Sequence, residues 1–185
     1  MKKTLILLAT ASLLGSLSHA GTVAHWQFND LTDSSGNGYN LTNTNSSTSL
    51  SGGQAIFTGG GSSTAGNDLM SAADNPAWDD TSFTVEAIFT FTAPSTAGIS
   101  TLAAHLSNGG GRQWLLGTSD TNTPYVILRN NASTPVESSI GSTFAALVSG
   151  NTYYFAAAID LTAATPADRI TFYLRDITND GPFQS

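Results

Sequence analysis

Residues 82–92 read Ser82-Phe83-Thr84-Val85-Glu86-Ala87-Ile88-Phe89-Thr90-Phe91-Thr92. Every second side chain in this stretch is apolar, and most of the side chains between them are polar. Alternation with a period of two is typical of a β-strand that turns one face toward a core. The stretch therefore predicts a strand, and its inward face is expected to consist of Phe83, Val85, Ala87, Phe89 and Phe91.

Further strand-like stretches follow along the chain, separated by clusters of Gly, Asn, Asp, Ser and Pro. Short strands broken by turn-forming residues predict an all-β fold, an antiparallel β-sandwich. Two pairs of neighbouring strands are expected, residues 113–117 with 125–130 and residues 153–159 with 170–175.

Two shorter stretches, residues 23–28 and 54–58, also have a strand-like pattern. In the first of them Trp26 alternates with Ala24 and Phe28, so Trp26 is expected to belong to the core. No stretch has a convincing helical period.

The composition excludes several classes of protein. The chain has 185 residues, of which 10% are charged, with six Lys and Arg residues in total, no cysteine and a net charge of −7. Six basic residues are too few for a surface that follows a phosphate backbone, so no nucleic-acid partner is expected. Without cysteine there is no disulfide scaffold, no thiolate nucleophile and no cysteine-type zinc site.

The first 20 residues have the pattern of a secretory signal peptide. Lys2 and Lys3 precede an apolar run over residues 4–17, and Ser18-His19-Ala20 ends in the small residues that a signal peptidase recognises. We expect cleavage before Gly21 and a secreted, extracellular or cell-surface protein with a net charge of −9. The apolar run is too short for a membrane span, and no later stretch is long enough for one.

An ordered set of motifs resembles laminin-G-like domains of the concanavalin A-like superfamily. The set consists of residues 25–30 (His-Trp-Gln-Phe-Asn-Asp), 33–38 (Asp-Ser-Ser-Gly-Asn-Gly), 83–87 (Phe-Thr-Val-Glu-Ala), 151–156 (Asn-Thr-Tyr-Tyr-Phe-Ala) and 170–176 (Ile-Thr-Phe-Tyr-Leu-Arg-Asp). This sequence departs from the family pattern at Ile88, where an aromatic residue is usual, and at Arg175, where Val is common. The resemblance covers residues 23 to about 180.

The resemblance implies a jelly-roll sandwich that occupies residues 21–185 as one domain. Family members continue with further strands beyond the last motif found here, so the domain is expected to be truncated at its C-terminus, with an unpaired sheet edge. The implied function is that of a secreted, non-catalytic recognition or adhesion module of bacterial type, which binds a glycan or an extracellular protein. Because one superfold hosts many functions, this step is an analogy.

An enzymatic alternative requires two acids at one site. Glycosidases of the same superfamily carry three clustered carboxylates on one strand, whereas this chain has two distant glutamates, Glu86 and Glu137. We therefore expect no catalytic residues. The alternative is a remnant of a glycoside hydrolase or lyase, in which Glu86 would lie about 5–10 Å from Asp160 or Glu137. A third hypothesis is a structural domain of a longer cell-surface protein.

Calcium is the metal that the sequence favours. Asp30, Asp33 and Asn37 lie close together on one loop beside Asn29, and calcium takes six to eight oxygen ligands from such side chains. The competing interpretation is turn chemistry, because Asp and Asn also bind their own backbone in tight turns. Structural calcium at this loop is thus a hypothesis.

Two residues are candidates for ligand binding. Trp78 lies in an acidic loop that also holds Asp74, Asp79 and Asp80, and Arg112 follows a run of three glycines. Sugar-binding surfaces combine an exposed aromatic face with polar neighbours, and Trp78 is the least constrained of the three tryptophans in the pattern of the sequence. The alternative for Trp78 is that it caps one end of the sandwich.

Overall fold

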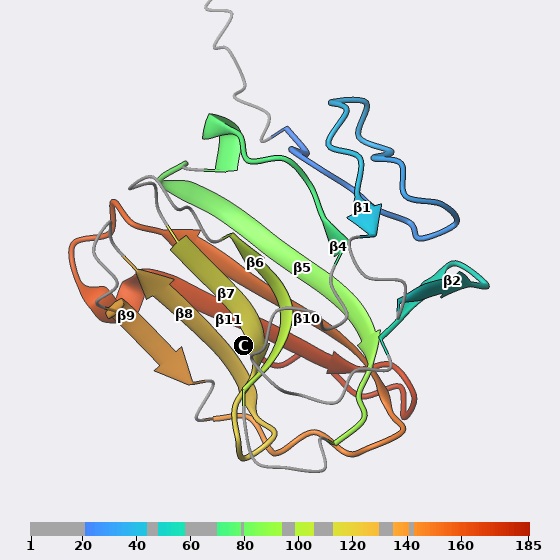
Figure 1. The fold of residues 1–185 in the computed structure, drawn as a ribbon. Coiled ribbons are helices and arrows are strands. Elements are labelled where there is room, and N and C mark those ends of the chain that lie inside the picture. Colours follow the sequence, from blue (N-terminus) through green and yellow to red (C-terminus); the bar gives the residue numbers. More distant parts are fainter. Residues whose placement is uncertain are drawn as a thin grey trace, which may run out of the picture.

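The computed structural model describes residues 21–43, 48–57, 70–78, 80–93, 99–105, 113–129, 135–140 and 143–185. The predicted signal peptide and Arg112 lie outside these residues. Within them the chain forms eleven β-strands and two 3₁₀ turns, without an α-helix (Figure 1). The predicted all-β class with antiparallel sheets is confirmed, and the arrangement of the two larger sheets is sandwich-like.

The first large sheet has three strands in the order β11-β10-β5. β5 covers Ser82–Thr90, β10 covers Thr152–Asp160 and β11 covers Ile170–Asp176, and both pairings are antiparallel. The central strand β10 places Phe155 opposite Ala87 and Leu174. The pairing of residues 153–159 with 170–175 is as predicted.

The second large sheet is a four-stranded antiparallel meander in the order β6-β7-β8-β9. Its strands are Ser100–His105, Gln113–Thr118, Pro124–Arg129 and Pro135–Ile140. The predicted pair of β7 and β8 is confirmed, whereas β6 and β9 were not predicted. A β-bulge interrupts the pairing of β6 with β7 after Thr101.

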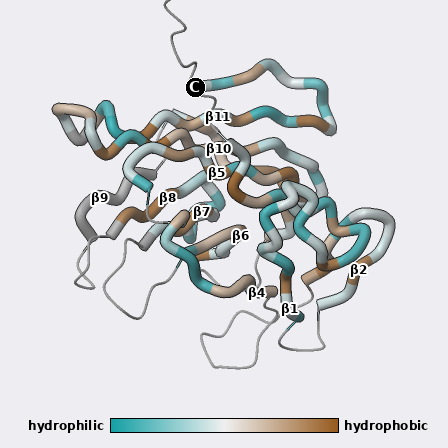
Figure 2. Tube along the Cα trace, turned by 90° about the horizontal axis from the view of Figure 1, so that it is seen from above, coloured by the Kyte–Doolittle hydropathy of each residue, from teal (hydrophilic) through white to brown (hydrophobic). Residues whose placement is uncertain are grey.

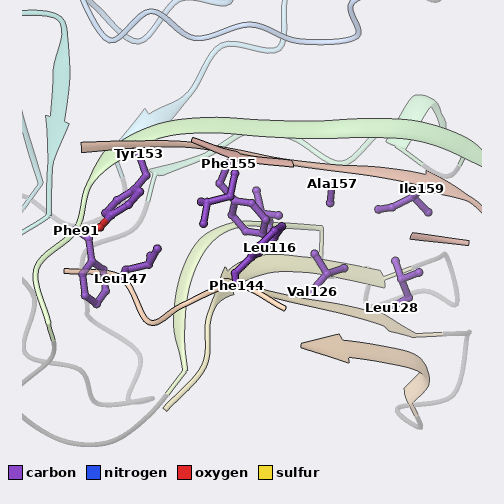
Figure 3. Packing of buried hydrophobic residues seen from close by; sticks show 11 residues of the cluster. Phe91, Leu116, Val126, Leu128, Phe144, Leu147, Tyr153, Phe155, Ala157 and Ile159 are labelled. Carbon is purple, nitrogen blue, oxygen red and sulfur yellow. The ribbon is translucent and has the colours of Figure 1, made fainter. Parts of the chain in front are cut away.

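The hydrophobic core fills the space between the two large sheets. Figure 3 shows side chains of β10 that point toward side chains of β7 and β8. Phe155 and Ala157 are fully buried, and Leu116 and Val126 are 1% exposed. The inward face predicted for β5 is confirmed, because Phe91 belongs to the core cluster and the other four residues pack against it: Phe83, Val85, Ala87 and Phe89.

The N-terminal part of the described chain lies beside the two large sheets, blue to teal in Figure 1. It contains two small antiparallel sheets. In one, β1 (Thr42–Asn43) pairs with β4 (Met70–Ser71), and in the other β2 (Ser49–Ser51) pairs with β3 (Gln54–Ile56). The 3₁₀ turn η1 (Pro76–Trp78) then leads into β5, and a second turn, η2 (Pro166–Asp168), precedes β11.

The strand predicted over residues 23–28 is wrong. This segment is irregular apart from one isolated bridge between Trp26 and Asp33. Phe28 has a φ of 57°, which a β-strand cannot accommodate. The placement of Trp26 in the core is also wrong, because Trp26 is half-buried among other N-terminal aromatic residues and not part of the core cluster.

Candidate functional site: an N-terminal loop and its aromatic cluster

Asp33 organises the loop that the sequence singled out. Its Oδ1 accepts hydrogen bonds from the backbone N–H groups of His25 and Ser35, each at 2.9 Å. Its Oδ2 accepts one from the Ser35 hydroxyl at 2.8 Å and one from the Tyr39 N–H at 3.1 Å. Asp33 is 8% exposed. One carboxylate thus ties the segment before the turn to both sides of the turn.

These bonds set the acidity of Asp33. Removal from water raises the pKa of a carboxyl group, but the donors of His25, Ser35 and Tyr39 favour the charged form more strongly. The pKa of Asp33 is consequently held well below its ordinary value. The group is a structural anion over the whole range of neutral and mildly acidic pH.

The other two predicted calcium ligands have separate local partners. Asp30 accepts hydrogen bonds from the backbone N–H and the hydroxyl of Thr32, which lowers the pKa of Asp30. Asn37 donates from Nδ2 to the carbonyl oxygens of Thr22 and Val23, both at 2.9 Å. Asp30 and Asn37 therefore each stabilise a turn or a neighbouring segment.

The hydrogen bonds that the Asp33 carboxylate already accepts compete with the binding of a calcium ion. A carboxylate offers about four lone-pair positions, and Asp33 uses four of them for the donors described above. A cation at Asp33 would have to replace at least one of these donors. Within the described residues, no three His, Cys, Asp or Glu side chains gather in a way that could hold a metal ion.

An aromatic cluster forms where the loop meets the turn η1. The ring of Trp78 stacks on Trp26 with centroids 6.2 Å apart and an interplanar angle of 22°, and it contacts Tyr39 at 4.9 Å. The Trp26 indole N–H donates to the Tyr39 carbonyl at 2.8 Å. All three side chains are half-buried. We call Trp26, Tyr39 and Trp78 the aromatic cluster.

The segment that carries Trp78 is fixed at two points. The turn η1 is capped by Asn75, whose side-chain oxygen accepts a hydrogen bond from the Ala77 N–H at 2.9 Å. One residue earlier, Asp74 contacts the ring Nε2 of His105 at 2.8 Å. His105 is nearly buried at the end of β6 and lies against Trp114. The four-stranded sheet therefore helps to position the aromatic cluster.

The structure brings only one of the predicted ligand-binding residues into a site that can be described. Trp78 joins the aromatic cluster, and Arg112 lies outside the described residues. Sequence reasoning missed Tyr39 and assigned Trp26 elsewhere. A signal for both was present, because the tight Ser-Ser-Gly-Asn-Gly turn returns the chain and brings aromatic residues on its two sides together.

Glu86 lies on the outer face of β5, away from the core. It accepts a hydrogen bond from the Tyr154 hydroxyl at 2.7 Å. Asp160 pairs in register with Ser82, four residues from Glu86 along β5, which corresponds to about 13 Å. The backbones at Glu86 and Asp160 are thus separated along the sheet, and the pairing of their carboxylates in one site stays a prediction. Glu137 is on β9 of the other large sheet.

Tyr154 is expected to ionise late in an alkaline titration. Partial burial, the hydrogen bond to Glu86 and the Glu86 charge raise the pKa of Tyr154 to about 12. Since the folded-state pKa lies above the ordinary value of about 10, the associated stabilisation is present below pH 10 and is lost as the pH rises through 12. Ultraviolet difference absorbance of the tyrosines should contain a late component that belongs to Tyr154.

Two variants check this assignment. Tyr154→Phe should remove the late component, and Glu86→Gln should shift it toward lower pH. A late component that persists in Tyr154→Phe would contradict the assignment.

Comparison with known proteins adds no family to this geometry: no protein-family model matches the chain, and no curated protein or solved structure matches it significantly. In the part of the chain that the structure describes, no helix has the length and apolar character needed to cross a membrane.

Proposed function

We propose that this chain is a secreted, non-catalytic recognition module that binds a glycan or an extracellular protein. The laminin-G-like motifs and the signal-peptide pattern support the proposal, as does the sandwich-like arrangement of two antiparallel sheets. In this proposal the two sheets belong to a jelly-roll of the concanavalin A-like type. The N-terminal segments then serve as the recognition surface.

The observation that carries the proposal is the aromatic cluster. Two tryptophans and a tyrosine gather outside the core cluster, on segments that lie N-terminal to β5. Polar loop groups, including Asp30 and Asn37, lie on the same N-terminal part of the chain. Apolar ring faces beside a few fixed polar groups are typical of small-ligand sites.

A glycan array tests the proposal directly. We expect the chain from residue 21 to bind a subset of glycans, and Trp78→Ala to weaken that binding at least tenfold because it removes the central ring of the cluster. Phe57→Ala is the matched control, since Phe57 is an aromatic residue that is 54% exposed on the same N-terminal part. Absence of binding to any glycan or extracellular protein would favour a structural domain. Equal binding by Trp78→Ala would remove the cluster from the site.

The calcium hypothesis is tested in the same assay by adding chelator. If calcium holds the loop, binding falls in chelator and returns with added calcium, and Asp30→Ala should raise the calcium concentration that binding requires or abolish the binding. Binding that is the same with calcium and with chelator would exclude a functional calcium ion at Asp30, Asp33 and Asn37.

A further inference from the structure

A row of large side chains crosses the outer face of the three-stranded sheet. The register pairs Ile88 of β5 with Tyr154 of β10, and Tyr154 with Arg175 of β11. The C-terminal segment extends the row, because Gln184 bridges to Leu174 and so brings Phe183 beside Arg175. We call Ile88, Tyr154, Arg175 and Phe183 the outer stripe.

Side-chain contacts hold the outer stripe together. The Tyr154 and Phe183 rings meet edge to face with centroids 5.7 Å apart, and the Arg175 guanidinium carbon lies 5.4 Å from the centroid of Phe183. Figure 2 shows the C-terminal segment alongside β11, on the side away from β10. Three strand spacings separate the ends of the stripe, or about 14 Å.

The outer stripe stands above a floor of small side chains. Ile88 is 69% exposed and Phe183 is 63% exposed, and Tyr173 on the next row is 38% exposed. Ala156 lies next to Tyr173 on the same face of the sheet and is buried. Beyond Ala156 the sheet carries a row of short residues. That row consists of Thr84, Ala158 and Thr171. The result is an elongated apolar platform and not a deep pocket.

The two charged side chains of this surface already have hydrogen-bond partners, although within the described residues only Arg175 has an ion-pair partner. Glu86 accepts the Tyr154 hydroxyl, and Arg175 pairs with Asp180 and donates to the Gly181 carbonyl. The chain carries a net charge of −7, so an anionic polymer would be repelled over most approaches. The charge distribution therefore favours a neutral ligand.

We propose that the outer stripe, together with Tyr173, binds an extended neutral polysaccharide. The apolar faces of sugar rings would pack on Ile88, Phe183 and the tyrosine rings, while sugar hydroxyls would bond to Glu86 and to the tyrosine hydroxyls. An elongated platform with aromatic residues and few polar groups suits a chain of linked rings better than a single small molecule. The outer stripe shares no residue with the aromatic cluster, and the proposal does not depend on that cluster.

The test measures how much of the protein insoluble polymers remove from solution. The probes are microcrystalline cellulose, chitin and insoluble xylan as neutral polymers and calcium-free alginate beads as an acidic polymer. We expect binding to at least one neutral polymer and none to alginate. The double variant Tyr173→Ala/Phe183→Ala should weaken the binding at least tenfold. Both residues are exposed, so circular dichroism should confirm an unchanged fold.

Two matched variants separate this proposal from the recognition function of the N-terminal part. Trp78→Ala should retain binding to the neutral polymer. Ile99→Ala should behave as the wild type, because Ile99 is 52% exposed but precedes β6 of the other large sheet. Binding that is lost in Trp78→Ala and kept in Tyr173→Ala/Phe183→Ala would overturn the proposal while supporting the aromatic cluster.

Two further outcomes would also overturn the proposal. One is the absence of binding to all three neutral polymers. The other is concentration-dependent self-association of the wild type that the double variant abolishes, as measured by light scattering, because the outer stripe would then be an interface between two copies of the chain.

Discussion

Phe155→Ala should lower the free energy of unfolding by about 3–5 kcal/mol, the cost of removing a large buried aromatic side chain from a packed core. Phe155 is completely buried at the centre of β10, and its ring stacks on Phe172 with centroids 6.1 Å apart. Figure 3 shows it between the two large sheets, surrounded by other side chains of the core. The measurement is chemical denaturation followed by tryptophan fluorescence.

The position of Phe155 makes this the largest stability effect that we expect from a single side chain. Small domains have a free energy of unfolding of only about 5–15 kcal/mol, so Phe155→Ala would remove a large part of it. Thr84→Ala is the control, because Thr84 is exposed on the outer face of the same sheet, and it should change the free energy by less than about 0.5 kcal/mol. Equal stability of Phe155→Ala and the wild type would mean that the two sheets do not share this core.

The same alternation that places Phe155 inside made β5 predictable from sequence. Phe83, Val85, Ala87 and Phe89 follow each other with a period of two because one face of β5 packs on the core and the other faces outward. The pairings of β7 with β8 and of β10 with β11 were predictable for a related reason. In both cases two apolar runs are joined by a short segment that contains turn-forming residues, which favours antiparallel neighbours.

β6 and β9 were not predictable in this way. In β6, a bulge after Thr101 breaks the period, and the partner position on β7 is Gly117. A Cβ at Gly117 would come within 2.2 Å of the Ser100 carbonyl oxygen, so glycine is required by the close approach of the two strands. β9 is an edge strand whose sequence, Pro-Val-Glu-Ser-Ser-Ile, has three polar residues among six and begins with proline. Proline is common on edge strands, but it lowers the strand signal of a sequence.

The first predicted strand failed for a reason that lies in side-chain chemistry. Residues 23–28 have the alternation of a strand, but their polar backbone groups bind side chains of the following loop. Ser35 donates to the Val23 carbonyl and Asp33 accepts from the His25 N–H. Ser and Asp side chains compete in this way with the ladder of a sheet. Periodicity alone does not reveal such competition.

The candidate site was predictable only in part. Trp78 was singled out because it lies in a polar loop, but its two ring partners come from segments about 40 and 50 residues earlier. A contact over that separation depends on how the Asp33 loop folds, which the sequence pattern does not specify. The outer stripe was hidden for a similar reason, since its four residues lie on four different segments.

Asp33→Ala should release the N-terminal loop and disperse the aromatic cluster. The substitution leaves four donors without their acceptor: the N–H groups of His25, Ser35 and Tyr39 and the Ser35 hydroxyl. Because the Tyr39 segment carries one ring of the cluster, loss of its anchor should also disturb Trp26 and Trp78. We expect a red shift of tryptophan emission and hydrogen exchange at Ser35 and Tyr39 that is faster by at least tenfold.

The pH dependence gives an independent check of the same carboxylate. The pKa of Asp33 is lowered in the folded chain, so its contribution to stability is complete above the ordinary carboxyl pKa of about 4. The contribution is then lost as the pH falls through the folded-state value. In the wild type, protection of the Tyr39 amide should therefore decline on acidification below pH 4.

In Asp33→Ala, by contrast, protection of the Tyr39 amide should be low at every pH. Chelator in all samples removes any contribution from a bound cation, and Asp30→Ala serves as the control, because Asp30 bonds only to Thr32 among the contacts described here. If amide hydrogen exchange in the N-terminal loop of Asp33→Ala is as slow as in the wild type, the Asp33 hydrogen bonds do not hold the aromatic cluster. In that case the cluster must be positioned from the other side, by Asn75 and the contact of Asp74 with His105.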